Sequence, residues 1–334
     1  MDQSMLLIGI AGLLIGTVVG MTGMGGGALM TPALIFLGVN PTAAVANDLV
    51  AAAIYKSVGA GVHWREGSPN LKLAGWLGIG SVPCAFAGAF IIRAVGTGEQ
   101  QQDFVKLALG CALLLAAGTY VLRLLVNLRE ITLNAARPDE DPPIKPLATI
   151  AVGAIGGALV GITSVGSGSV IMVTLLLLYP GLQAVKLVGT DLVQAVPLVL
   201  AAAISHVIVS GVDWEVLIPL VIGSIPGIYA GSKLANRVPQ TVVRRGIVFL
   251  LFITGLGLVG VDPVIAVISG VLAMIAGTLA WAAIRRRYGL PPFRGRARRQ
   301  RQSAAAAAAK DLPPAAGGPG ANRDTSDGSS TKEP

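Results

Sequence analysis

Residues 12–27 read GLLIGTVVGMTGMGGG, and residues 153–168 read GAIGGALVGITSVGSG. The second stretch repeats glycines and a threonine of the first, 141 residues further on: Gly12, Gly16, Gly20, Thr22, Gly25 and Gly27 recur as Gly153, Gly157, Gly161, Thr163, Gly166 and Gly168. Each stretch interrupts an apolar run of about 34 residues, which as one straight helix would measure about 51 Å. That length exceeds the hydrocarbon core of a bilayer, about 30 Å. Each run is therefore predicted to form two shorter helices, as a re-entrant hairpin or a broken helix.

The repeat continues downstream of the glycines. After two extra residues near Tyr179 the separation becomes 143 residues, and GSVPCAFAG at 80–88 then matches GSIPGIYAG at 223–231. The same separation relates Asp48 to Asp191, His63 to His206 and Pro83 to Pro226. Chance matches are common in apolar sequence, but the only two histidines of the chain fall in register. We therefore predict a duplicated membrane domain.

The composition is that of a membrane protein. Hydrophobic residues make up 53% of the 334 residues and charged residues 13%, with a mean hydropathy of +0.73, whereas soluble domains carry about 25% charged residues. Apolar runs of membrane-spanning length recur near 5–38, 43–62, 73–95, 104–126, 147–179, 187–211, 216–235, 247–261 and 264–284. The predicted fold is all-α and integral to the membrane, with about eight to ten membrane segments.

The predicted organisation follows from the repeat and from the charge distribution. Its parts are a first transmembrane repeat (1–127), a polar cytoplasmic linker (128–146), a second repeat (147–261), an extra C-terminal helix (262–287) and a basic, disordered cytoplasmic tail (288–334). The net charge of +8 arises mostly in the tail, whose arginines indicate contact with anionic lipid. No aromatic interleaving accompanies these arginines, so nucleic-acid binding is not expected. With the arginines cytoplasmic, the positive-inside bias favours inverted repeats and an outside N-terminus.

The glycine-rich centres are the candidate solute sites. Irregular backbone at membrane depth is tolerated only where protein or a water-filled cavity covers it, and a helix start there exposes N–H groups that bind anions. The predicted substrate-binding residues are Thr22, Gly23, Met24, Gly25, Gly26 and Gly27, and Thr163, Ser164, Gly166, Ser167 and Gly168. The alternative is that glycines only allow helices to pack closely, which is favoured for Gly12, Gly16 and Gly20.

Two carboxylates inside apolar runs are the candidate coupling groups. Asp48 follows Asn47, and Asp191 follows Thr190. A carboxylate within a membrane span is costly and by default suggests an ion or proton pathway. The alternative is that these four residues cap the starts of helices. The sequence leaves both interpretations open.

Other polar residues of the runs give weaker signals. His63 and His206 lie fifteen residues beyond the aspartates, about four helical turns, and are expected at an interface or, less strongly, in gating. Pro83 and Pro226 predict kinks in equivalent helices and are weak gating candidates. Lys56 is either a snorkelling residue or a basic contact for an anion. No metal site or cofactor is expected.

Three segments resemble the TauE/SafE family of membrane permeases, named for sulfite and sulfoacetate export. They are residues 16–49, GTVVGMTGMGGGALMTPALIFLGVNPTAAVANDL; residues 157–179, GALVGITSVGSGSVIMVTLLLLY, followed by VGTDLV; and residues 223–239, GSIPGIYAGSKLANRVP. The resemblance covers about residues 10–260 and implies a secondary carrier of small sulfur-containing or organic anions in the bacterial inner membrane. It also implies that the breaks, Asp48 and Asp191 form the functional site.

The expected function is therefore anion transport and not catalysis. One alternative is a non-transporting membrane assembly or scaffold protein, whose arginine-rich tail binds lipid or another protein. A second is an intramembrane serine protease built on Ser167 and His206. The repeat argues against the protease, because Gly26 stands where the first half would need the nucleophile.

Overall fold

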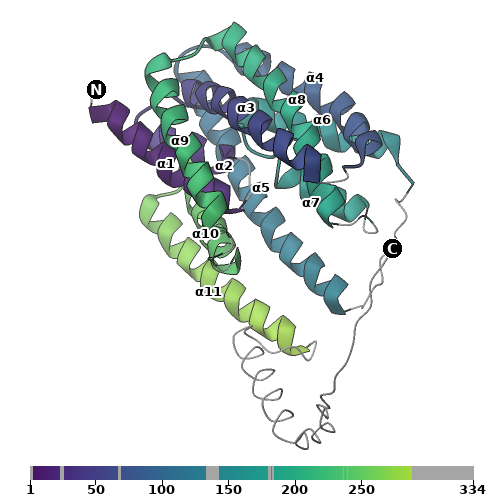
Figure 1. Cartoon of the computed structure of the whole chain (residues 1–334). Coiled ribbons are helices and arrows are strands. Elements are labelled where there is room, and N and C mark those ends of the chain that lie inside the picture. Colours follow the sequence, from purple (N-terminus) through teal and green to yellow (C-terminus); the bar gives the residue numbers. More distant parts are fainter. Residues whose placement is uncertain are drawn as a thin grey trace, which may run out of the picture. The chain divides into compact units, whose positions relative to one another are not determined.

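The computed structural model describes residues 3–22, 26–66, 69–132, 143–179, 182, 184–235, 237–238 and 240–287. These residues form eleven helices and no strand (Figure 1): α1 Gln3–Thr22, α2 Gly27–Phe36, α3 Pro41–Glu66, α4 Leu71–Val95, α5 Glu99–Thr132, α6 Pro146–Thr163, α7 Val170–Leu178, α8 Ala184–Ser210, α9 Trp214–Leu234, α10 Gln240–Leu258 and α11 Pro263–Arg287. The chain divides into two compact units, Met1–Ile275 and Ala276–Pro334. All contacts among α1 to α10 lie within the first unit.

Local sequence accounts for several helix ends. Asn70 and Asp213 precede α4 and α9, and their side chains accept hydrogen bonds from the backbone N–H groups of Leu73 and Glu215, each at 3.0 Å. Such side chains satisfy N–H groups that a helix start leaves without an internal partner. Gly38 and Gly211 follow α2 and α8 with φ of 91° and 75°, a conformation that residues with a Cβ rarely adopt. The chain can therefore reverse direction at these points.

Among the described residues, seven helices are long and apolar enough to cross a membrane. They are α1, α4, α5 over Glu99–Leu122, α6, α8 over Gly189–Ser210, α9 and α11 over Pro263–Ala283. Helices α2 and α7 have 10 and 9 residues and are too short to cross alone. The prediction of a polytopic all-α membrane protein is confirmed. The predicted linker 128–146 begins later than expected, because α5 continues to Thr132, and residues 133–142 lie outside the described part.

The glycine-rich faces pack two pairs of helices closely. Helix α1 lies along α9, and α6 lies along α4, so the first helix of each predicted repeat packs on a helix of the other repeat. A Cβ added to Gly16 would approach the carbonyl oxygen of Ser224 to 2.6 Å, and one added to Gly157 would meet the carbonyl oxygen of Ser81. The packing interpretation of these glycines is confirmed, since only a residue without a Cβ allows the backbones to approach so closely.

The contacts of the two helix pairs repeat each other in register. Gly12 faces the carbonyl of Leu220, and its counterpart Gly153 faces the carbonyl of Leu77. Further along, Gly20 faces Ile228 and Gly161 faces Ala85. Each contact in one pair is thus made by the repeat-related residues in the other. This agreement is what a duplicated chain predicts, while the inverted orientation of the repeats stays a prediction.

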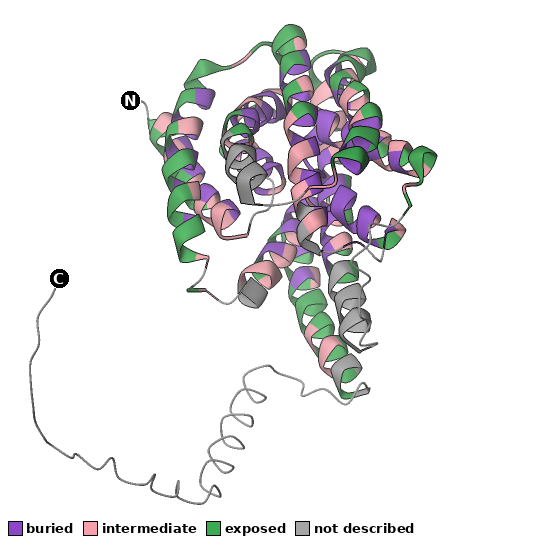
Figure 2. Cartoon of the chain, turned by 45° about the vertical axis from the view of Figure 1, so that its right-hand side comes forward, coloured by how far each residue is buried: buried purple, intermediate pink, exposed green. Residues whose placement is uncertain are grey.

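Buried residues gather where helices face one another, and the outward faces are apolar and exposed (Figure 2). Helices α3 and α8 contact each other and contribute Leu49 and Leu198 to the largest buried cluster. On the outside, Ile155 and Ile222 are each 67% exposed. Large apolar side chains on an outer surface suit contact with lipid, because the hydrocarbon gives no penalty for their exposure. Polar residues that are buried in such a protein therefore stand out as functional candidates.

Candidate functional site

The first break, an interruption between two helices, separates α1 from α2. Helix α1 ends at Thr22 and α2 begins at Gly27; three predicted site residues, Gly23, Met24 and Gly25, lie outside the described part. The Gly26 carbonyl accepts hydrogen bonds from the N–H groups of Leu29 and Met30 at 3.0 and 2.9 Å and so starts the new helix. The Thr22 hydroxyl donates to the Val18 carbonyl of its own helix at 2.8 Å. Thr22 thus completes the end of α1.

The second break is a buried, irregular segment between α6 and α7. Helix α6 ends at Thr163 and α7 begins at Val170. Among the described residues, Ser164 is the only non-glycine residue with a positive φ, which is 61°. Gly166 has a φ of 131°. The side chains of Ser164, Ser167 and Ser169 are 7%, 4% and 7% exposed. Protein therefore covers this irregular backbone, as its depth in a membrane would require.

The two breaks touch each other. A Cβ added to Gly27, the first residue of α2, would collide with the carbonyl oxygen of Ser164 and lie 2.6 Å from its Oγ. Glycine at position 27 is thus needed for the contact between the start of α2 and the second break. Residues far apart in the sequence, one from each predicted repeat, meet at this point.

Asp48 lies at this meeting point. Its side chain is 0% exposed, and its Oδ2 accepts hydrogen bonds from the hydroxyls of Thr31 on α2 at 2.6 Å and of Ser164 at 2.7 Å. Its Oδ1 is buried and has no hydrogen-bond partner among the described residues. Because a buried carboxylate needs strong compensation, these two hydroxyls fix Asp48 between α2 and the second break. Sequence reasoning did not identify Thr31.

The helix-cap interpretation of the aspartates is wrong. Helix α3 begins at Pro41 and α8 at Ala184, so Asp48 and Asp191 lie in the interiors of their helices. The residues before them contact other groups. The Asn47 amide donates to the Ala43 carbonyl at 2.8 Å, while the Thr190 hydroxyl accepts from the Asn70 N–H at 3.0 Å. About two helical turns precede each acid within its helix, and the apolar pattern did not reveal them.

Lys56 connects the aspartates to the second break. Its ammonium donates to the hydroxyl of Ser167 at 2.6 Å and interacts electrostatically with the carboxylates of Asp191 and Asp48. The side chain is half-buried. The cluster thus holds one ammonium and two carboxylates from the repeat-related helices α3 and α8. The only signal in the sequence was that Lys56 is a lone lysine in an apolar run.

Another polar pair was missed in the sequence. Gln194, three residues after Asp191 on α8, donates a hydrogen bond to the hydroxyl of Ser81 on α4, and both side chains are buried. The Oε1 atom of Gln194 has no partner among the described residues. This pair joins α8 to the same turn of α4 that packs on Gly157.

The histidine of the second repeat is buried among the helices and has a hydrogen-bond partner, while its expected place at a membrane interface stays a prediction. His206 is 1% exposed, and its Nε2 lies 2.8 Å from the carbonyl oxygen of Gly161, near the end of α6. It lies inside because α8 packs on both α4 and α6. The side chain of His63 lies outside the described part. Helices α4 and α9 continue through Pro83 and Pro226.

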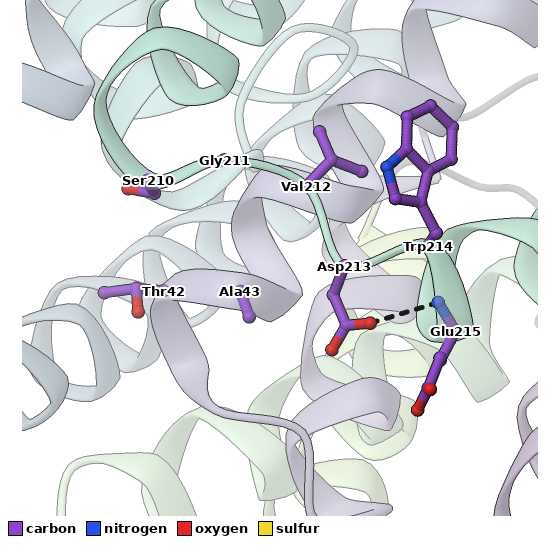
Figure 3. Close-up of a pocket in the computed structure, with 8 residues that line it drawn as sticks. All are labelled: Thr42, Ala43, Ser210, Gly211, Val212, Asp213, Trp214 and Glu215. Atoms are coloured by element: carbon purple, nitrogen blue, oxygen red, sulfur yellow. Dashed lines mark hydrogen bonds between the residues drawn. The ribbon is translucent and has the colours of Figure 1, made fainter.

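Two cavities of the structure lie away from the breaks. One, of about 560 Å³, is formed at the α8–α9 connection by Ser210 to Glu215 with Thr42 and Ala43 (Figure 3). The other, of about 480 Å³, is an apolar groove between α3 and α8. Neither is lined by Asp48, Lys56 or a residue of the breaks. These two cavities therefore do not mark the polar centre.

The described residues hold no group of three or more histidine, cysteine or acidic side chains able to bind a metal ion. The polar centre instead offers hydroxyls, one ammonium and two carboxylates. These groups can exchange hydrogen bonds and protons with a small charged solute.

Comparisons with known proteins agree with the resemblance seen in the sequence. Residues 8–258 match the family model described as "Sulfite exporter TauE/SafE". The chain is 38% identical over 253 residues to the "Probable membrane transporter protein YjnA" of Bacillus subtilis (strain 168), covering 75% of this chain and 98% of that protein. It is 26% identical over 252 residues to the "Probable membrane transporter protein YdhB" of the same organism, covering 75% of this chain and 98% of that protein. It is 24% identical over 271 residues to the "Probable membrane transporter protein YunE", also of that organism, covering 75% of this chain and 93% of that protein.

No solved structure matches the chain. The family match extends from residue 8, within α1, to the end of α10 and includes both breaks and both aspartates. With its apolar helices and these relatives, the chain is a multi-pass integral membrane protein of the TauE/SafE family.

Proposed function

We propose that this protein is a secondary carrier of a small anion, such as sulfite, sulfoacetate or a related organic anion. We propose further that the anion binds at the two breaks, between α1 and α2 and between α6 and α7. The supporting observation is the junction at Asp48, where the start of α2 and the second break meet inside the helix bundle. Broken helices that meet at the interface of two repeats are the usual binding sites of secondary transporters.

The second break has the chemistry of an anion site. The segment 164–169 precedes the start of α7, where backbone N–H groups and the positive end of the helix dipole favour negative charge. The Gly166 carbonyl already accepts from the N–H of Val170 at 3.1 Å, so the helix start is ordered. The Ser167 and Ser169 hydroxyls lie in the same segment. An oxyanion with several acceptor oxygens suits such a set of donors.

Asp48 and Asp191 are the proposed coupling groups. A carboxylate beside an anion repels it, so the two are compatible only if the carboxylate takes up a proton when the anion binds. Asp48 is enclosed by Thr31 and Ser164, both of which are polar and neutral. A proton bound there would cancel the charge that an incoming anion adds. Coupling to a proton gradient follows from this arrangement.

Alternating access is proposed to use the two closely packed helix pairs. Helices α1 and α9 form one pair, and α6 and α4 form the other. In an inverted repeat these pairs would occupy equivalent places relative to opposite membrane faces. Movement of one pair while the other stays fixed would open the centre to one side. Asn47, Thr190, His63, His206, Pro83 and Pro226 are the candidate residues for coupling and gating around this movement.

The proposed location is the bacterial inner membrane with a cytoplasmic C-terminus. The arginines that begin at Arg285, in the last turn of α11, and continue beyond the helix favour the cytoplasmic side and anionic lipid. The loop around Asp213 and Glu215, which lines the cavity in Figure 3, then lies outside.

Reconstitution into proteoliposomes tests the function. Purified protein should transport at least one of sulfite, thiosulfate, sulfoacetate or a simple carboxylate, and an imposed proton gradient should increase its accumulation. A scaffold protein would give no flux above empty vesicles with any of these anions. Ser167→Ala separates the third possibility, because it should abolish proteolysis by a serine protease and leave a carrier with measurable flux.

A further inference from the structure

Lys56 extends toward the second break. It lies eight residues after Asp48 on α3, and its ammonium ends 2.6 Å from the Ser167 hydroxyl, 111 residues away in the sequence. A snorkelling lysine would direct its ammonium to the membrane surface. Lys56 instead directs it to the irregular segment between α6 and α7, where its position is defined by a side-chain partner.

Consecutive residues of α3 contact repeat-related positions of the two breaks. The hydroxyl of Tyr55 lies against Gly26, where an added Cβ would collide with it, while Lys56 bonds Ser167. Gly26 and Ser167 are 141 residues apart and correspond in the repeat. This part of α3 therefore lies between the two breaks and presents one cation there.

The charge is not duplicated with the repeat. The residue that corresponds to Lys56 in the second half, 143 positions later, is Val199, which is 1% exposed. The carboxylates are duplicated, since Asp48 corresponds to Asp191, and both interact with the Lys56 ammonium. An anion that binds to the ammonium would therefore compete with these two carboxylates for its positive charge.

The donors are arranged to bind such an anion. An ammonium carries three N–H donors, and the hydrogen bond to Ser167 uses one of them. The Ser167 hydroxyl accepts this bond through a lone pair and keeps its own O–H donor. Lys56 and Ser167 can therefore donate together to two oxygens of one oxyanion. At the repeat-related position on α8, Val199 is apolar and offers no such donor.

We propose that Lys56 is the cationic ligand of the transported anion, and that it holds a small oxyanion together with the Ser167 hydroxyl between the two breaks. This inference rests on the proposed function. It assigns to Lys56 the positive charge that favours anions at the site, although the negative charges of Asp48 and Asp191 act there as well.

Initial rates of sulfite uptake into proteoliposomes test the proposal. Lys56→Met should raise the KM for sulfite by about 10- to 100-fold, the loss expected for one charge-assisted hydrogen bond. Lys56→Arg should retain more of the affinity, because it keeps the charge. The matched control is Lys106→Met on α5, a lysine whose side chain is 41% exposed and pairs with Asp103 at 3.6 Å; it should leave the KM unchanged. An unchanged KM in Lys56→Met overturns the proposal.

A double variant separates a ligand from a mere counter-ion. If Lys56 only neutralises the carboxylates, then Lys56→Met combined with Asp191→Asn should restore the KM for sulfite, and this result would overturn the proposal. If Lys56 binds the anion, the KM should stay high in the double variant. Size-exclusion profiles of both variants should match that of the wild type.

A measurement on the wild-type protein guards against variants that fail to fold. Sulfite should slow the acylation of Lys56 by an amine-reactive reagent, measured by mass spectrometry, and should not affect Lys106. Equal acylation of Lys56 with and without sulfite overturns the proposal. If the wild type transports none of the tested anions, the proposed function fails as well. If it transports sulfite and Lys56 is not protected, only the role of Lys56 fails.

Discussion

The Ser164 hydroxyl donates a hydrogen bond of 2.7 Å to Oδ2 of Asp48, across 116 positions of the sequence. The donor belongs to the break of the second predicted repeat, and the acceptor belongs to helix α3 of the first. Because of this bond, we expect a change of charge on Asp48 to alter the segment that is proposed to bind the anion.

Asp48→Asn should separate coupling from translocation. The amide has nearly the shape of the carboxylate and keeps one oxygen as acceptor, but it cannot take up a proton in the physiological range. We expect accumulation of sulfite under a proton gradient to be lost, while exchange of labelled sulfite between preloaded vesicles and medium continues. Asp191→Asn should behave in the same way. Wild-type pH dependence of uptake in both variants would remove the coupling role.

Two substitutions of Ser164 should differ in stability. Ser164→Ala loses the hydroxyl and keeps a Cβ at φ of 61°, whereas Ser164→Gly loses the hydroxyl and relieves the backbone. We expect the glycine variant to be more stable by about 1 kcal/mol, since the left-handed conformation costs residues with a Cβ about that much. Thermal unfolding in detergent measures the difference. Equal unfolding temperatures would mean that the backbone at Ser164 is not strained.

Gly157→Ala should loosen the α4–α6 pair. The added methyl group would collide with the Ser81 carbonyl, so one helix backbone must shift, and such overpacking costs about 1–3 kcal/mol. We expect a lower unfolding temperature in detergent. The matched control is Gly78→Ala on α4, where an added Cβ meets nothing within 4 Å. Because alanine favours helix over glycine, this control should be as stable as the wild type or more stable. The packing argument fails if both variants unfold at the same temperature.

Removing residues 288–334 should leave transport intact. The family match ends at residue 258, and the proposed site lies between positions 22 and 206. We expect the truncated protein to transport sulfite at a rate within about twofold of the wild type in vesicles without anionic lipid. Loss of function on truncation, with the truncated protein still folded by size-exclusion, would instead favour the scaffold alternative.

Sequence alone led to the class of fold and to much of the polar centre. The glycine-rich stretches 20–27 and 161–168 predicted interruptions of the two apolar runs, and α1 and α6 end within these stretches, at Thr22 and Thr163. The costly aspartates marked α3 and α8 as candidate functional helices. The interior positions of Asp48 and Asp191 in their helices were not decided by the sequence, because alanine, valine and leucine before each acid suit a helix or a loop entry equally. The contribution of Thr31 could not be seen, since its partner is a tertiary neighbour.

By itself, then, the sequence determined that this is a polytopic helical membrane protein with duplicated, glycine-interrupted runs, because composition and periodicity are local properties that set length, solvent and secondary structure. Only the tertiary structure decided that α1 packs on α9 and α6 on α4, and that Asp48, Ser164, Lys56 and Ser167 meet. Apolar helices in lipid gain little from hydrophobic burial against one another, so close backbone approach and interhelical hydrogen bonds choose the partners. These choices depend on the three-dimensional match of two surfaces, which no single stretch of sequence contains.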